Sequence, residues 1–152
     1  MDKEASGFNT KQTVAIVGLG LIGGSYARGL RRLGVDHIIA VDPDEKALQQ
    51  AKQEGMVDDI YMAGTEALKQ ADLVIFCTAA DVMIRFLAEN KAFFTPGTIL
   101  TDVAGIKGDT ATAIAALLPE GVDFVPGHPM AGREGRGYGM ASADIFNGAN
   151  YI

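Results

Sequence analysis

Residues 13–23 read TVAIVGLGLIG, an apolar, β-branched run followed at once by three glycines in the pattern GxGxxG. In this pattern the first glycine permits a tight turn after a strand, the second lets backbone approach a pyrophosphate, and the third lets the next helix pack closely on the sheet. The free N–H groups that open that helix favour an anion. The stretch therefore predicts a strand, a phosphate-binding turn and a helix; the alternative is a turn that only joins the two. The predicted cofactor-binding residues are Gly18, Leu19, Gly20, Leu21, Ile22 and Gly23.

The rest of the chain continues this alternation of strand and helix. Runs that are nearly continuous in apolar residues, as in strands covered on both faces, are TVAIV (13–17), HIIAV (37–41), LVIFC (73–77), TILTDV (98–103) and VDFV (122–125). Between them, helical spacing and capping residues predict helices that end near Leu33, span about Pro43 to Glu54, include residues 82–87, and cover about Thr110 to Leu118. The final ANYI (149–152) is predicted to be a further strand. This order predicts an α/β fold with a doubly wound parallel sheet of the Rossmann type.

Asp42 ends the second predicted strand, about 20 residues after the glycine motif, where a carboxylate accepts hydrogen bonds from an adenosine ribose. A 2′-phosphate would meet this negative charge, and no arginine follows within PDEKA (43–47). The position therefore predicts NAD as the cofactor in preference to NADP. The same residues also resemble the start of a helix, with Asp42 as the N-cap and Pro43 at the first helical position. Both interpretations can hold together.

The third predicted strand ends in the small residues Cys77, Thr78 and Ala79, at the carboxyl edge of the sheet. A cofactor lies in the crevice at this edge in open α/β sheets, so we expect backbone contacts with it here. Nothing cationic lies near Cys77 in sequence, which favours a small buried apolar residue over a reactive thiol.

Composition excludes several classes of protein. Thirteen Lys and Arg against 19 Asp and Glu give a net charge of −6, which makes nucleic acid an improbable partner. One cysteine allows no internal disulfide, and no Cys/His spacing supports a metal site, so we expect a cytoplasmic protein without a metal. No apolar run approaches the roughly 20 residues that cross a bilayer. The polar opening, residues 1–12, is predicted to be a flexible tail.

A glycine-rich loop, PGHPMAGREGRG (126–137), follows the last long strand and carries His128. The loop belongs to the edge of the sheet where we expect the nicotinamide. Free imidazole is mostly neutral at pH 7 and can accept a hydroxyl proton while a hydride leaves the same carbon, which is the chemistry of alcohol oxidation. From position alone, His128 is equally explained as a loop histidine held by Pro129. His37 begins the second strand and is interpreted as structural.

Three segments carry a resemblance to a known family: VAIVGLGLIGGS (14–25), TDVAGIKG (101–108) and GHPMAGREGRGYGMASADIFNGANYI (127–152). Together they resemble the cofactor-binding domain of the prephenate dehydrogenase family, which includes arogenate and cyclohexadienyl dehydrogenases. The resemblance implies that His128 polarises the ring hydroxyl of prephenate for hydride transfer to NAD. Loss of the ring carboxylate as CO₂ then gives 4-hydroxyphenylpyruvate, on the route to tyrosine. Arogenate, which would give tyrosine directly, stays open as the substrate.

Prephenate carries two carboxylates, so cations should recognise it. Arg133 is the first candidate because arginine suits bidentate carboxylate binding, with Glu134 to orient it. Lys107 is a second candidate that could instead only support its turn, and Arg136 is as well explained as a solvent-exposed charge. Many family members carry a serine where Gly105 stands, and that serine helps to position substrate and histidine. Gly105 has no side chain for this role, so either another residue takes the role or this chain lacks it.

The resemblance also implies a helical domain that closes the substrate pocket and forms a homodimer. None of it is in this chain, so we expect residues 13–152 to be the NAD-binding domain and to turn over poorly alone. The two alternative functions are a non-catalytic, NAD-binding regulatory module and a different hydroxyacid or imine dehydrogenase. The loop at 127–139 argues against both.

Overall fold

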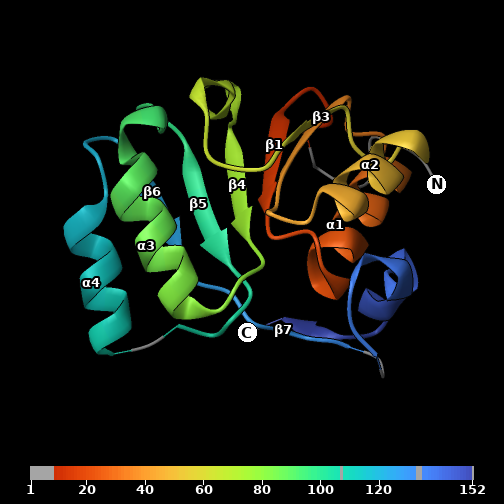
Figure 1. Cartoon of the computed structure of the whole chain (residues 1–152). Coiled ribbons are helices and arrows are strands. Elements are labelled where there is room, and N and C mark those ends of the chain that lie inside the picture. Colours follow the sequence, from red (N-terminus) through yellow and green to blue (C-terminus); the bar gives the residue numbers. More distant parts are fainter. Residues whose placement is uncertain (1–8, 107, 133–134, 152) are drawn as a thin grey trace.

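The computed structural model describes residues 9–106, 108–132 and 135–151. Its centre is a sheet of parallel strands in the order β3-β2-β1-β4-β5-β6 (Figure 1). This confirms the doubly wound parallel sheet. The order reverses between β1 and β4, and ligands bind at that point outside the carboxyl ends of the strands. The strands are β1 (Thr13–Val17), β2 (His37–Val41), β3 (Asp59–Tyr61), β4 (Leu73–Phe76), β5 (Ile99–Asp102) and β6 (Asp123–Val125).

Helices cover the two faces of the sheet because alternate residues of each strand point to opposite sides. In β1, Val14 and Ile16 join the core with α1 and α2, whereas Ala15 and Val17 join the core with α3 and α4. The helices are α1 (Leu21–Arg32), α2 (Glu45–Gln53), α3 (Ala80–Asn90) and α4 (Asp109–Leu117). Short 3₁₀ turns complete the connections: η2 (Glu66–Gln70), η3 (Lys91–Phe93), η4 (Tyr138–Met140) and η5 (Ala143–Phe146). The core on both faces is apolar, which explains why the strand sequences lack polar alternation.

The start of α2 corrects the sequence-based interpretation. Asp44, and not Asp42, is the N-cap: its Oδ1 accepts from the backbone N–H of Lys46 at 3.1 Å and of Ala47 at 3.3 Å. Pro43 therefore precedes the helix and is not its first residue. The two aspartates stand two residues apart, and this difference decides which carboxylate is left to face the glycine-rich turn.

Two further strands differ from the predictions. Strand β3 was not predicted, because it has only three residues, all half-buried, and begins with Asp59. The predicted strand at 149–152 is confirmed at Asn150–Tyr151 (β8), but it lies outside the main sheet. It pairs antiparallel with β7 (Pro129–Met130) to form a separate two-stranded ribbon.

The segment that follows β6 crosses the carboxyl edge of the sheet and returns to α1, where η4 and η5 pack (Figure 1). Tyr138 is only 3% exposed, and its hydroxyl donates to Glu54 Oε2 at 2.8 Å. The Arg28 guanidinium lies 5.1 Å from the centre of the Tyr138 ring. A Cβ on Gly24 would stand 2.7 Å from this ring, so the glycine lets the segment approach α1 closely. A tyrosine from the C-terminal part of the chain thus completes the core under α1.

Candidate functional site

The glycine-rich turn has the backbone geometry that its sequence predicts. Gly18 has a φ of +96°, and its N–H donates to the Val41 carbonyl at 2.8 Å. A Cβ on Gly23 would stand 1.8 Å from the Gly18 carbonyl oxygen, so α1 begins in direct contact with the turn. At Gly20 a Cβ would meet no atom within 4 Å, which leaves this side of the turn open. The turn is therefore closed where the chain packs and open where a ligand would approach.

Asp42 joins the end of β2 to this turn. Its Oδ2 accepts from the Leu19 N–H at 2.6 Å, and its Oδ1 accepts from the Asp44 N–H at 2.8 Å. Each carboxylate oxygen can accept a second hydrogen bond, so the side chain keeps acceptor capacity for a hydroxyl group. The Leu19 side chain is 1% exposed and belongs to the core. Leu19 therefore contributes to the site through its backbone N–H, which donates to Asp42.

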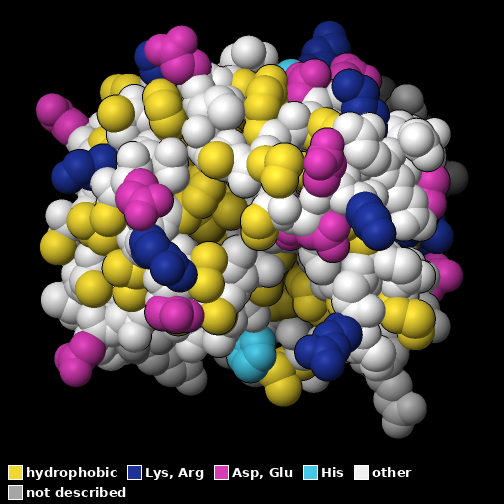
Figure 2. Space-filling view, viewed as in Figure 1, with side chains coloured by type: hydrophobic (Ala, Val, Ile, Leu, Met, Phe, Trp, Pro, Cys, Tyr) yellow, Lys and Arg dark blue, Asp and Glu magenta, His cyan; other side chains and the backbone are white. Residues whose placement is uncertain are grey.

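A cavity of about 760 Å³ lies over the turn, within the roughly 300–1,000 Å³ range of small-molecule sites. Figure 2 shows apolar side chains in the hollow near the centre of this face. Of the predicted residues, those that line the cavity are Gly18, Gly20, Asp42, Cys77 and Thr78. The predicted Leu19, Leu21, Ile22, Gly23 and Ala79 are not among its lining residues.

The far wall of the cavity was missed from the sequence. It comes from the turn after β3 and from one side of α3, and its members are Met62, Ala63, Gly64, Val82, Arg85, Phe86, Glu89 and Asn90. On α3 these residues recur at intervals of three and four, a spacing that marks one helix face. In the structure, two of this wall's large apolar side chains stay exposed, 54% for Met62 and 36% for Val82, which the sequence alone does not indicate. Arg85 brings a cation into the same cavity as Asp42 although the two are far apart in sequence.

The Cys77 thiol lines the cavity but is a poor nucleophile. Loss of water around the sulfur and, second, the negative charge of Asp102 raise the pKa of Cys77 above its ordinary value. A thiol held in its neutral form reacts slowly, because the thiolate is the nucleophile. This agrees with the interpretation of Cys77 as a packing residue.

His128 follows β6 and is exposed at the same carboxyl edge of the sheet. Its ring lies directly against Gly105: a Cβ built there would stand 2.8 Å from His128 Nδ1 and 3.1 Å from Cγ. Gly105 also has a φ of +70°, which L side chains rarely adopt. The imidazole thus occupies the space that a side chain at position 105 would need.

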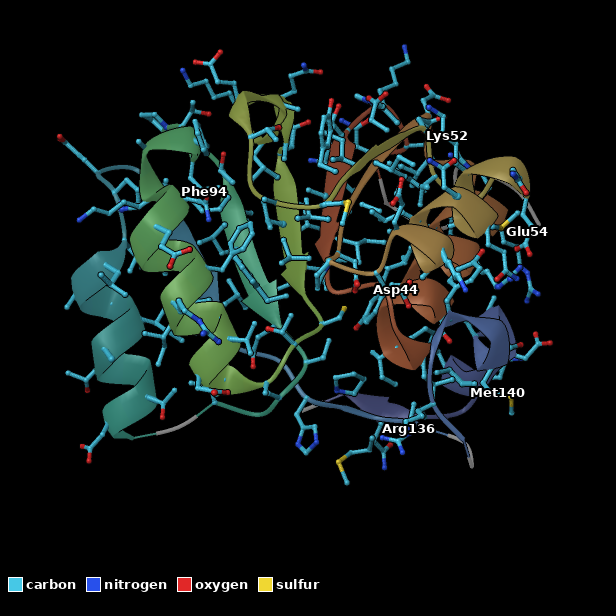
Figure 3. The ribbon with its side chains drawn as sticks, viewed as in Figure 1. Asp44, Lys52, Glu54, Phe94, Arg136 and Met140 are labelled. Atoms are coloured by element: carbon cyan, nitrogen blue, oxygen red, sulfur yellow. The ribbon has the colours of Figure 1, made fainter. Side chains whose placement is uncertain are left out.

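The other candidate residues fall into three groups. His37 Nε2 donates to Asp59 Oδ2 at 2.6 Å, and His37 Nδ1 lies 3.3 Å from Thr13 Oγ1, at the opposite edge of the sheet, which agrees with a structural role. Arg136 is exposed on the C-terminal segment, where Figure 3 labels it. The predicted substrate residues Lys107, Arg133 and Glu134 lie outside the described residues.

The described part of the chain shows neither a metal cluster nor a membrane-spanning helix. Residues 9–106, 108–132 and 135–151 contain no group of three His, Cys, Asp or Glu side chains that could hold a metal ion. In the same residues, every helix is too short or too polar to traverse a lipid bilayer.

Solved structures of two similar proteins share the fold of this chain. A solved structure of Aquifex aeolicus prephenate dehydrogenase, in complex with hydroxyphenyl propionate and NAD⁺, superposes with a TM-score of 0.85 at 25% identity, covering 97% of this chain and 51% of that chain. Synechocystis arogenate dehydrogenase superposes with a TM-score of 0.82 at 31% identity, covering 91% of this chain and 48% of that chain.

Sequence comparison gives the same family. Prephenate dehydrogenase from Bacillus subtilis (strain 168) is 32% identical over 149 residues, 93% of this chain and 39% of the relative. The chain therefore spans about two-fifths to one-half of the length of these relatives. The family model described as "Prephenate dehydrogenase, nucleotide-binding domain" matches residues 26–152. On this evidence the chain belongs to the prephenate dehydrogenase family and corresponds to its nucleotide-binding domain.

Proposed function

We propose that the chain binds NAD and supplies the general base for the oxidative decarboxylation of prephenate to 4-hydroxyphenylpyruvate. One observation supports this above the others: an exposed imidazole, His128, stands at the same carboxyl edge as a glycine-rich turn whose open side faces a cavity. A bare nucleotide-binding module would need the turn but not the histidine.

The residues around the cavity fit a dinucleotide. The N–H groups at the start of α1 would hold the pyrophosphate, because Gly20 leaves space for it and the helix N-terminus favours an anion. Asp42 would accept from the adenosine ribose hydroxyls with the acceptor capacity that Leu19 and Asp44 leave free. When bound, NAD supplies the acceptor for the hydride. Asp42 would also favour NAD over NADP, since it repels a 2′-phosphate.

His128 would accept the proton of the ring hydroxyl as the hydride leaves the carbon that carries it. The electrons of the bond to the ring carboxylate then enter the ring as CO₂ departs, the ring becomes aromatic, and the hydroxyl oxygen regains a proton. This contact is supported by the exposure of His128 to solvent at the carboxyl edge of the sheet. Arg133 is proposed to bind a substrate carboxylate, with Glu134 to orient it and Lys107 as a further cation.

Arogenate is a second candidate substrate, favoured by the similarity to Synechocystis arogenate dehydrogenase at 31% identity. Arogenate differs from prephenate at the side-chain carbon, and the same proton and hydride transfers would give tyrosine. Because the chain spans only part of its relatives' length, turnover and homodimer formation are proposed for a protein that also carries a helical domain. We expect the chain alone to bind NAD but to turn over poorly.

The test replaces His128 with asparagine in a protein of the relatives' length that contains this chain. We expect kcat to fall by about 10²- to 10⁴-fold, the usual cost of losing a general base, with the Kd of NAD largely unchanged. His37→Asn is the matched control, since His37 binds Asp59 at the opposite edge, and it should leave kcat unchanged. Assays with prephenate and with arogenate distinguish the two substrates.

Unchanged turnover in His128→Asn would remove this residue from the mechanism. NAD binding without turnover of either acid, in the unsubstituted protein, would support a non-catalytic module instead.

A further inference from the structure

Asp102, the last residue of β5, is a carboxylate that is only 1% exposed. Removal of a carboxylate from water is costly unless charge-assisted hydrogen bonds compensate for the lost hydration. Here Oδ2 accepts from the Ala104 N–H at 2.9 Å and Oδ1 accepts from the Gly127 N–H at 3.0 Å. One buried side chain therefore binds the backbone of two loops that follow different strands.

Each of the two loops continues directly into a residue of the contact between His128 and Gly105. Ala104 precedes Gly105, against which the ring of His128 packs, and Gly127 precedes His128 itself. A third hydrogen bond joins the loops, from the Gly105 N–H to the Gly127 carbonyl at 3.3 Å. The carboxylate and this bond fix the distance between the residue that carries the imidazole and the residue on which the ring rests.

We propose that Asp102 is the positioning residue of His128. It acts through the two N–H groups and not by touching substrate, and its importance for turnover rests on the proposed role of His128 as the base. Asparagine is nearly the same size but has a single acceptor oxygen, and its NH₂ group would face one of the two N–H donors. In Asp102→Asn one loop is therefore released while the volume of the side chain is kept.

Imidazole NMR spectra of this chain test the proposal without any need for activity. The chain has two histidines, so His37 serves as an internal reference. We expect Asp102→Asn to move or broaden the ring ¹⁵N and ¹³C signals of His128 and to leave those of His37 in place. The matched control is Asp72→Asn: Asp72 Oδ2 accepts the Thr13 N–H at 2.8 Å at the other edge of the sheet, and its loss should leave the His128 signals unchanged.

A folded Asp102→Asn whose His128 ring signals equal those of the original chain would overturn the proposal. If this variant does not fold, amide exchange in the unsubstituted chain decides. Gly127 and Ala104 should then exchange as slowly as the amides of β5 and at least about 100-fold more slowly than free amides. Exchange at the rate of free amides would overturn it.

In a protein of the relatives' length, Asp102→Asn should lower kcat by about 10- to 100-fold, as expected for a misplaced base, with KM and the Kd of NAD nearly constant. A rise in KM and in the Kd of NAD as large as the fall in kcat would instead indicate general damage and contradict a positioning role. Full turnover of His128→Asn together with shifted ring signals in Asp102→Asn would refute the proposed function but leave the positioning role intact.

Discussion

Two walls of the site are built in different ways. The cofactor wall is one continuous unit, in which β1, the glycine-rich turn, α1 and the end of β2 follow one another in the chain. Its contacts include Gly23 against the Gly18 carbonyl and the hydrogen bond from the Leu19 N–H to Asp42. The His128 wall joins loops from β5 and β6, and the buried carboxylate of Asp102 binds both. Added side-chain volume should therefore disrupt the first wall and its NAD binding. The second wall should be disrupted when one hydrogen-bonding group is lost or the histidine is displaced.

The largest effect is expected from Gly23→Ala, which adds a methyl group to the cofactor wall. The Cβ would stand 1.8 Å from the Gly18 carbonyl oxygen, a contact that only a shift of backbone can relieve. We expect a loss of at least about 3 kcal/mol in the free energy of unfolding, together with loss of NAD binding. Urea unfolding and calorimetric titration with NAD measure the two effects.

Gly20→Ala is the control for that substitution, because a Cβ there meets no atom within 4 Å. It should fold with nearly unchanged stability yet bind NAD more weakly, since the methyl group enters the space left for the pyrophosphate. Equal stability of Gly23→Ala and Gly20→Ala would contradict the close packing of α1 on the turn.

The His128 wall should respond next most strongly, to Gly105→Ala. The new Cβ would stand 2.8 Å from His128 Nδ1 and would also place an alanine at a φ of +70°. We expect the imidazole to be displaced and turnover of the longer protein to fall about 100-fold. Gly55→Ala provides the control: its φ is +73°, but nothing lies within 4 Å of a Cβ there.

Both alanines should cost about 1–2 kcal/mol of stability for the left-handed backbone, as measured by urea unfolding. Only Gly105→Ala should shift the His128 ring signals. If Gly55→Ala shifts them as much, the effect is not due to the contact between ring and glycine.

A smaller effect is expected at Asp42, on the cofactor wall. Asp42→Asn removes the charge that repels a 2′-phosphate and weakens the bonds to ribose hydroxyls. We expect NAD affinity to fall about 10-fold, which is about 1.4 kcal/mol and close to the low end for a hydrogen bond to a charged group, while the preference for NAD over NADP narrows. Asp44→Asn, which alters the adjacent N-cap, should leave both affinities unchanged. Tighter binding of NADP than of NAD by the unsubstituted chain would reverse the assignment.

The smallest effect concerns Glu54, which links the segment beyond His128 to α2. Hydrogen bonds from Gln50, then from Tyr138, and the Arg28 guanidinium lower the pKa of Glu54 below its ordinary value. A lowered pKa means that the stabilisation is complete above the ordinary pKa and is lost as the pH falls through the lower value of the folded state. Glu54 is about one-third exposed, so its contribution is roughly 1 kcal/mol or less.

Urea unfolding at pH 7 and at pH 3 should therefore show a stability difference between the original chain and Glu54→Gln that shrinks at the lower pH. A difference that stays constant would show that the charge of Glu54 is not involved. Figure 3 labels Glu54 next to the end of α2, and Met140 on the C-terminal segment.

The contrast between the walls also explains how much the sequence could predict. The strands and helices of the sheet follow from apolar runs and caps, and Gly18, Gly20 and Asp42 follow from a motif of fixed spacing. Strand β3 escaped because three half-buried residues carry no periodic signal. The turn at 62–64 and the inner side of α3 reach the cavity only through tertiary packing, so their roles could not be read from spacing.

Asp102 shows the same limit at a single residue. In TILTDV it is an acid at the end of an apolar strand, and nothing in its neighbours indicates that it faces the backbone 25 positions later. His128 was identified through a motif and a family resemblance, whereas its support was visible only once the loops after β5 and β6 were placed together. A reactive residue type such as His128 is easier to find in a sequence than a residue such as Asp102 that fixes the backbone beside it.

The stretch between His128 and Tyr138 is secured at both ends, by Asp102 through Gly127 and by Glu54 through the Tyr138 hydroxyl. Neither attachment depends on the identity of the residues between them. A substitution between these two attachments leaves both hydrogen bonds in place, so this interval can vary in sequence while the backbone that carries His128 and the glycine-rich turn keep their positions.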